Sequence, residues 1–290
     1  MIQKTWKWFR RPNKSTFAQY VETFLIILPL AFVIRTYFYG LYQVPTGSME
    51  TTMLVGERFF ADKFTVLFWP PKRGDIISFN DPVFEYSDNK YKRLFEQYVW
   101  GPSNWTKRVI GIPGDHIKGI IEDGKPVIYL NDEKLDEPYV NKHPLIAVYK
   151  EGKMPPFEFR SWDKLVDFED QPFYKMDSIN VKKAARLLNQ FGQEAIRYPG
   201  VPEVNGYGRN VDEYDVYLGP TQYWVMGDNR RASNDSRFWG PLDSEHIHGK
   251  IVWRIISVDS SDPWLVFDIL QHPIEFWSRV RWNRFFQRMQ

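Results

Sequence analysis

The chain contains no cysteine among its 290 residues. This absence excludes disulfide bonds, thiol nucleophiles and zinc–thiolate centres, although it does not identify the redox compartment. An excess of one charge is also lacking: 38 Lys and Arg against 36 Asp and Glu leave a net charge of +2, which argues against a nucleic acid or another polyanion as a partner. Aromatic residues, in contrast, make up 17% of the chain, an enrichment typical of β-structure and of membrane interfaces.

A basic segment precedes an apolar one near the N-terminus. Residues 1–16 carry five Lys and Arg and no acid, and almost every residue between Glu22 and Arg35 is apolar. Because a spanning helix needs about 20 mostly apolar residues, we expect residues 17–42 to form an uncleaved transmembrane anchor. A buried core helix is the alternative, and a cleaved signal peptide is disfavoured by the lack of an A-x-A pattern. The basic excess predicts a cytoplasmic N-terminus, with everything after about Gly40 outside.

The other end of the chain, residues 259–290, forms a tail rich in aromatic and basic residues. Its last part mixes the two types: Trp277, Trp282, Phe285 and Phe286 with Arg279, Arg281, Arg284 and Arg288. Such a composition suits a helix lying in the membrane interface. The arginines and aromatics do not separate on a helical wheel, so an ordinary helix docked on the domain is the alternative.

Short apolar runs punctuated by Gly, Pro, Asp and Asn fill most of the sequence between these ends. They are "RFFADKF", "DIISFN", "WTKRVIGI", "PVIYLN", "YWVMG" and "KIVWRIISV". Their spacing predicts a mainly β fold with an antiparallel core, formed by residues 43–140 and 221–258. Residues 81–104 read as an excursion from this core. Residues 141–220 read as an inserted α/β accessory region, with a helix expected at 181–198.

The stretch "VPTGSMETTM" presents Ser48 just after the expected anchor. It is not a G-x-S-x-G nucleophile elbow, and a serine hydroxyl attacks only when a neighbouring base removes its proton. The five histidines are His116, His143, His246, His248 and His272, and none lies in a sequence setting typical of a base. His246 and His248 would share one face of a strand, but no third ligand is grouped with them. We therefore expect solvated surface histidines, no metal and no cofactor.

A lysine is the other candidate base. Its amine must be neutral, which requires lowering its pKa from about 10.4 to roughly 7–8 by burial away from carboxylates. Lys107 fits, because Trp105 and Val109 flank it on the same face of a predicted strand. The alternative is a surface lysine on an edge strand.

Four stretches in order, "VPTGSMETTMLVGE", "RGDIISFNDP", "KRVIGIPGDHI" and "MGDNRRASNDSRFWGP", resemble the signature boxes of bacterial type I signal peptidases. The resemblance covers the anchor and the β core. It implies a membrane-anchored endopeptidase with Ser48 as nucleophile and Lys107 as general base. Ser233 matches the serine that orients the lysine. Thr46 matches the residue whose hydroxyl, with the Ser48 backbone N–H, holds the oxyanion.

The same resemblance assigns two further sets of residues. Those expected to shape the site without reacting are Gly227, Asp228, Asn229, Arg230, Asp235, Ser236 and Arg237. Those expected to line shallow pockets for the small residues of a signal peptide are Tyr42, Val44, Met49, Met53, Phe59 and Trp105. Thr51 and Arg231 depart from the common pattern at positions that concern substrate preference more than the dyad.

The implied partners are the signal peptides of exported preproteins and the lipid bilayer, next to the secretion translocon. The implied location is the inner (cytoplasmic) membrane, crossed once, with the catalytic domain on the outer, periplasmic side. Aromatics such as Phe60, Phe64, Phe68 and Trp69 are expected to dip into the interface. Two alternatives remain at this point: a self-cleaving repressor-type Ser/Lys protease, and an inactive membrane-anchored β-domain that only binds partners.

Overall fold

The structure is a computed structural model that describes residues 15–98, 101–143, 145–149, 157–161, 211–258, 260 and 264–289. The helix expected at 181–198 and nearly all of the basic segment 1–16 lie outside these residues. All strand pairs between described residues are antiparallel, which agrees with the mainly β fold expected from the sequence.

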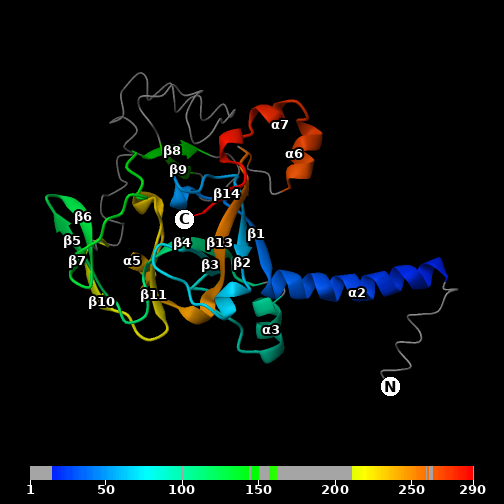
Figure 1. Ribbon diagram of the computed structural model, residues 1–290, viewed down its shortest axis with the longest axis horizontal. Helices are drawn as coiled ribbons and strands as arrows, with labels where there is room; N and C mark the ends of the chain where they lie inside the picture. The colour runs from blue at the N-terminus through cyan, green and yellow to red at the C-terminus, as the bar shows by residue number, and fades with distance from the viewer. Residues whose placement is uncertain are drawn as a thin grey trace.

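Helix α2 (Thr16–Tyr37) projects from one end of the molecule (Figure 1). Residues 19–37 are long and apolar enough to cross a membrane, and none of this window is buried in the structure. The alternative of a buried core helix is therefore excluded. The expected anchor boundary at residue 42 was wrong, because Tyr39–Gln43 forms strand β1 and pairs with β2 (Arg58–Asp62). The aromatic composition continues from the helix into this strand, which hid the change in conformation.

The main sheet has eight strands and carries the site. Its order is β1-β2-β13-β3-β4-β11-β12, with β14 added to β13. The strands not yet bounded are β3 (Ile76–Asn80), β4 (Asn104–Gly111), β11 (Gln222–Met226), β12 (Leu242–Asp243), β13 (Ile247–Ile256) and β14 (Gln287–Arg288). Strand β2 alternates buried and half-buried residues, whereas β3 is buried along most of its length. The second pattern is expected for a central strand covered on both faces.

Two smaller sheets complete the β-structure. One has the order β10-β5-β6-β7, and its strands are β5 (His116–Glu122), β6 (Lys125–Leu130), β7 (Glu133–Lys134) and β10 (Tyr214–Tyr217). The other is a hairpin of β8 (Leu145–Tyr149) and β9 (Phe157–Ser161). Strand β10 falls within the range 141–220 assigned to the insertion, yet it pairs with β5. The C-terminal end of the expected insertion, residues 214–217, therefore belongs to the same sheet as β5 and β6 of the core.

The six apolar runs taken as strands in the sequence all lie on observed strands: β2, β3, β4, β6, β11 and β13. The excursion between β3 and β4 contains α3 (Lys90–Tyr98). After β13 the chain forms α6 (Leu265–Gln271), α7 (Glu275–Ser278) and the short 3-10 turn η7 (Trp282–Arg284) before β14. Phe276 and Val280 pack with Val258 in a core cluster of their own. The C-terminal tail is therefore docked on the domain, as one of the two alternatives expected.

Candidate active site

Ser48 and Lys107 meet although 59 positions separate them in sequence. Ser48 lies in a 3-10 turn, η1 (Gly47–Met49), between β1 and β2, and Lys107 lies on β4. The Lys107 Nζ is 3.1 Å from the Ser48 Oγ and 3.3 Å from the Thr106 carbonyl oxygen. A neutral amine at 3.1 Å from a hydroxyl oxygen can accept the hydroxyl proton, so this pair has the distance that general base catalysis requires.

The Lys107 amine is buried, with only 5% of the residue exposed. Burial lowers its pKa from an ordinary value of 10.5 to about 8. The carboxylates of Asp235 and Asp228 act in the opposite direction and the guanidinium of Arg237 in the same direction. Lys107 forms no ion pair with any residue that the structure describes, because both carboxylates are engaged by arginines. The amine is thus shielded from water without an acid to hold it protonated.

The turn that carries Ser48 is held by the segment after β11. The Asn229 backbone N–H donates to the Ser48 carbonyl at 3.1 Å, and its Nδ2 donates to the Gly47 carbonyl at 2.9 Å. A Cβ on Gly227 would lie 2.3 Å from the Ser233 Oγ and 2.5 Å from the Ser48 carbonyl oxygen. Only glycine allows this approach, so the Gly227–Asn229 backbone positions the candidate nucleophile.

Ser233 is brought to the site, but the expected hydrogen bond to Lys107 is not formed. Its hydroxyl is buried and makes no hydrogen bond of standard geometry with a described residue. The hydroxyl lies close to the Asp235 carboxylate instead and contributes to lowering the pKa of that group. Thr46 is exposed at the start of η1, and its side chain forms no capping hydrogen bond. The hydroxyl is therefore available to a group outside the protein.

The charged residues expected to shape the site form buried ion pairs. Arg108 donates to both oxygens of Asp228 at 2.8 and 2.7 Å, one strand position from Lys107. Arg237 pairs with Asp235 and also with Asp212. Burial acts to raise the pKa of Asp235, but the Arg237 guanidinium holds it below its usual range.

The remaining members of this set also bond to their surroundings. Arg230 pairs with Glu137, and the Ser236 hydroxyl accepts a hydrogen bond from the Val225 N–H at 3.0 Å. Both contacts link the segment after β11 to a neighbouring part of the chain. None of these contacts includes the Ser48 hydroxyl or the Lys107 amine.

The histidines take no part in this arrangement, but one of them was predicted wrongly. His248 is not a solvated surface residue: its Nδ1 is 3.1 Å from the Tyr42 Oη and 3.3 Å from the Ser78 Oγ. Burial, with the nearby Lys63 charge, lowers the pKa of His248 to about 3. Among the described residues, no group of three or more His, Asp and Glu could hold a metal ion.

The residues expected to line the substrate pockets fall into two groups. Val44, Met49, Met53 and Phe59 are buried together in one core cluster, and Met53 and Phe59 are only 1% and 0% exposed. They therefore offer almost no surface to a ligand. Tyr42 packs on this cluster and Trp105 on the neighbouring one, and both are partly exposed. The Trp105 ring centre lies 5.8 Å from the Lys107 Nζ.

Sequence reasoning missed the residues that connect the insertion to the site. Glu50 is buried two positions after Ser48, and its carboxylate accepts a hydrogen bond from the Ser161 N–H at 2.9 Å. Asn141 bonds to the Ser161 hydroxyl and donates from its backbone N–H to the Asp228 carbonyl at 2.8 Å. An acidic residue next to the nucleophile was visible in the sequence, but nothing there showed that it would be buried against β9.

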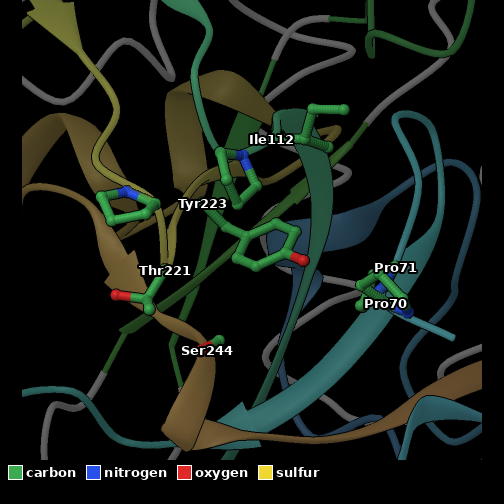
Figure 2. Close-up of a pocket in the computed structure, with 8 residues that line it drawn as sticks. Pro70, Pro71, Ile112, Thr221, Tyr223 and Ser244 are labelled. Atoms are coloured by element: carbon green, nitrogen blue, oxygen red, sulfur yellow. The ribbon is translucent and has the colours of Figure 1, made fainter. Parts of the chain in front are cut away.

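A cavity of about 410 Å³ lies elsewhere, between the loops near Pro70 and Ile112 and the segment around Tyr223 (Figure 2). Figure 2 shows the Tyr223 ring in its middle, with Thr221 and Ser244 to one side. None of its lining residues belongs to the Ser48–Lys107 arrangement. We assign it no role in the chemistry, because it brings no base and nucleophile together.

Comparison with known proteins places most of the chain in one family. The family model "Signal peptidase, peptidase S26" matches residues 17–256. Signal peptidase I of Aquifex aeolicus is 28% identical over 242 residues, covering 80% of this chain and 81% of that protein. Signal peptidase I of Rickettsia bellii is 26% identical, covering 96% and 87%, and that of Buchnera aphidicola from Schizaphis graminum is 26% identical, covering 82% and 74%.

A solved signal peptidase I from Enterococcus faecalis is 17% identical and covers 63% of this chain and 97% of its own. Its TM-score of 0.28 is too low to support an argument about the fold. The family model, in contrast, spans the anchor, the nucleophile turn, the lysine strand and the segment after β11. The chain therefore belongs to the signal peptidase family, peptidase S26.

Proposed function

We propose that Ser48 and Lys107 are the catalytic dyad with which this chain, a membrane-anchored serine endopeptidase, cleaves signal peptides. The observation that supports this assignment most directly is the 3.1 Å distance between the Ser48 hydroxyl and the Lys107 amine, which is buried and forms no ion pair with a described acid. Family membership and the unburied helix α2 do not favour the self-cleaving repressor-type protease or the inactive binding module.

In this reaction the neutral Lys107 amine takes the proton of the Ser48 hydroxyl while the Oγ attacks the carbonyl carbon of the scissile bond. The resulting ammonium then gives that proton to the leaving amine, and the C–N bond breaks. Water, deprotonated by the same amine, hydrolyses the acyl-enzyme and restores the hydroxyl. One base therefore acts twice, and its pKa must lie near the working pH in both half-reactions.

Thr46 and the Ser48 backbone N–H form the oxyanion site in this proposal. Thr46 is exposed and its hydroxyl caps nothing, which leaves the donor free for a developing negative charge. Losing one such donor costs about 100-fold to 1,000-fold in kcat in serine proteases. We expect Thr46→Val to lower kcat by about this factor with little change in KM, and Thr46→Ser to retain most of the rate. An unchanged kcat in Thr46→Val would remove Thr46 from the mechanism.

Substrate selection would use the alternation of side chains along an extended peptide. The small residues at the first and third positions before the cut point the same way. Of the six pocket candidates, Tyr42 and Trp105 offer surface that these residues can contact. Val44, Met49, Met53 and Phe59 support them from within the core. We infer that the bulky walls exclude large side chains by steric contact.

Contact of the aromatic turn after β2 with the membrane would fix the distance between the active site and the lipid surface. Phe38, directly after α2, stacks on Phe64 with ring centres 5.1 Å apart. Phe64 begins a short turn in which Phe68 and Trp69 are largely exposed. Phe60 was expected to join them, but it is half-buried and packs against Tyr39. We propose that this turn meets the interface on the outer side of the inner membrane, close to where the translocon releases preproteins.

Cleavage of a preprotein by the full-length protein in detergent tests the dyad. Ser48→Ala and Lys107→Ala should each abolish cleavage while the fold, followed by circular dichroism, is retained. Ser244→Ala and Lys118→Ala, which remove exposed side chains on elements that carry neither Ser48 nor Lys107, serve as matched controls and should cleave normally. Cleavage by Ser48→Ala at the rate of the unmutated protein would refute the assignment. No cleavage by the unmutated protein would favour a binding module.

A further inference from the structure

The C-terminal segment, residues 264–289, has its polar and apolar groups arranged in an unusual way. Several of its charged side chains pair within the protein, whereas Glu275 and Arg288 are exposed. Arg279 pairs with the fully buried Asp268, and Arg284 donates to the buried Glu57 carboxylate with its Nε at 2.6 Å. The backbone N–H of Arg281 donates to the Ser257 carbonyl at 2.9 Å. These contacts neutralise charge internally and hold the segment against the loop that follows the nucleophile turn.

Many large apolar side chains of the same segment face outward, in contrast to the buried Phe276 and Val280. Eight of them are more than half exposed: Trp264, Val266, Phe267, Leu270, Ile274, Trp277, Trp282 and Phe286. Trp277 stacks on Trp282 with ring centres 6.1 Å apart. The tertiary structure thus separates most of the two residue types that do not separate on a helical wheel: Arg279 and Arg284 face the protein and most of the aromatics face outward, although Arg288 is exposed and Phe276 is buried. An exposed apolar surface of this extent indicates an interaction site.

The position of this surface indicates what covers it. In Figure 1, α6 and α7 lie on the side of the molecule from which α2 projects, while the sheet containing β5, β6 and β10 lies at the opposite end. Along the direction of α2, these two helices lie level with the end of the helix nearest the domain. If α2 spans a bilayer, the outward face of α6 and α7 is therefore at the height of the lipid interface. Tryptophan and phenylalanine are the residues enriched at that height.

We propose that residues 264–289 form a further membrane contact, in addition to α2 and the turn at residues 64–69, in which the outward face of α6 and α7 lies in the lipid interface beside the anchor. This inference rests on α2 being the anchor, not on the identity of the dyad. Charge is compatible with a bilayer as the occupant: Arg279, Arg284 and Asp268 are paired within the protein, and the exposed Glu275 carboxylate lies 3.6 Å from His272. Burying the outward face in the interface then removes water from apolar groups without exposing an unpaired buried charge. This contact would also restrict rotation of the catalytic domain about α2.

Because the chain has no cysteine, single labels can test this directly in the full-length protein. Phe267→Cys and Ile274→Cys carry a fluorescent nitrobenzoxadiazole group in vesicles of phosphatidylethanolamine and phosphatidylglycerol. Tyr217→Cys, an exposed aromatic position on β10, is the matched control, and Ile26→Cys within α2 reports anchor insertion. All four are made in the Ser48→Ala background, so the result does not depend on cleavage.

We expect labels at 267, 274 and 26 to lose fluorescence to a nitroxide quencher carried on the lipid chains, and the label at 217 to lose it only to aqueous iodide. Labels at 267 and 274 that respond to iodide as strongly as the label at 217 overturn the proposal. So does shielding that grows with protein density but not with the lipid quencher, since a second copy or another protein then covers the face. A label at 26 outside the lipid overturns both the anchor and this contact.

Discussion

The pH dependence of cleavage is the sharpest consequence of the Lys107 environment. Only the neutral amine can take the Ser48 proton, and burial brings the Lys107 pKa to about 8 from an ordinary 10.5. The neutral fraction is then about one tenth at about pH 7 and about one hundredth at about pH 6. With an unshifted pKa it would be roughly 3 in 10,000 at about pH 7. Burial thus increases the competent fraction about 300-fold at neutral pH.

We therefore expect log(kcat/KM) for preprotein cleavage to rise with a slope of one up to about pH 8 and then to level off. The assay is a rate profile in detergent, with substrate kept below KM so that the free enzyme is titrated. His248→Gln is the control, since the pKa of His248 is about 3 and the residue cannot produce the rise. A midpoint near the ordinary histidine value of about 6.5, or a profile without a rising limb, would refute the role of the buried amine.

Three further predictions concern the scaffold. Lys107→Met should raise the free energy of unfolding by up to about 3 kcal/mol at neutral pH. It should also remove the rise in stability of the unmutated protein between about pH 8 and 10.5, where Lys107 is protonated in the unfolded chain but not in the folded one. Urea titrations at several pH values measure both effects, and an unchanged stability would contradict the burial argument. Asp228→Asn leaves the buried Arg108 without its carboxylate and should cost about 3 kcal/mol or more, whereas Asp215→Asn, in a half-exposed pair with His116, should cost less than about 1 kcal/mol. Gly227→Ala should displace the nucleophile turn and lower kcat strongly, while Gly219→Ala, whose nearest neighbour is the flexible Gln222 side chain at 3.2 Å, should retain activity; equal rates for the two variants would show that the close approach does not matter.

The sequence was informative wherever local chemistry decides the outcome. The apolar runs from "RFFADKF" to "KIVWRIISV" predicted strands, because alternation and turn residues act over a few positions. The motif around Ser48 and the apolar flanks of Lys107 predicted which two side chains to examine. The end of the anchor was misplaced, since residues 39–43 are as aromatic as the helix before them and only pairing with β2 makes them a strand.

Burial of polar groups was the information that the sequence lacked. His248 was expected to be solvated, yet it is half-buried and bonds to Tyr42. Glu50 and Glu57 are buried against partners far along the chain, and nothing in the sequence indicated this. The mixed aromatic and basic tail left two alternatives open, because the direction of a side chain in short, bent helices depends on the surface that they dock against. Arg284, for example, faces inward, where it pairs with Glu57 and donates to the Thr52 carbonyl.

By itself the sequence determined the chemical groups and the local conformations: an apolar helix at one end, a set of short strands, a serine in a turn and a lysine on an apolar strand. The tertiary structure alone decided that the hydroxyl and the amine lie 3.1 Å apart and that the amine is dry. The reason is physical: a pKa shift of this size comes from desolvation, and desolvation is produced by residues that are neighbours in space and not along the chain.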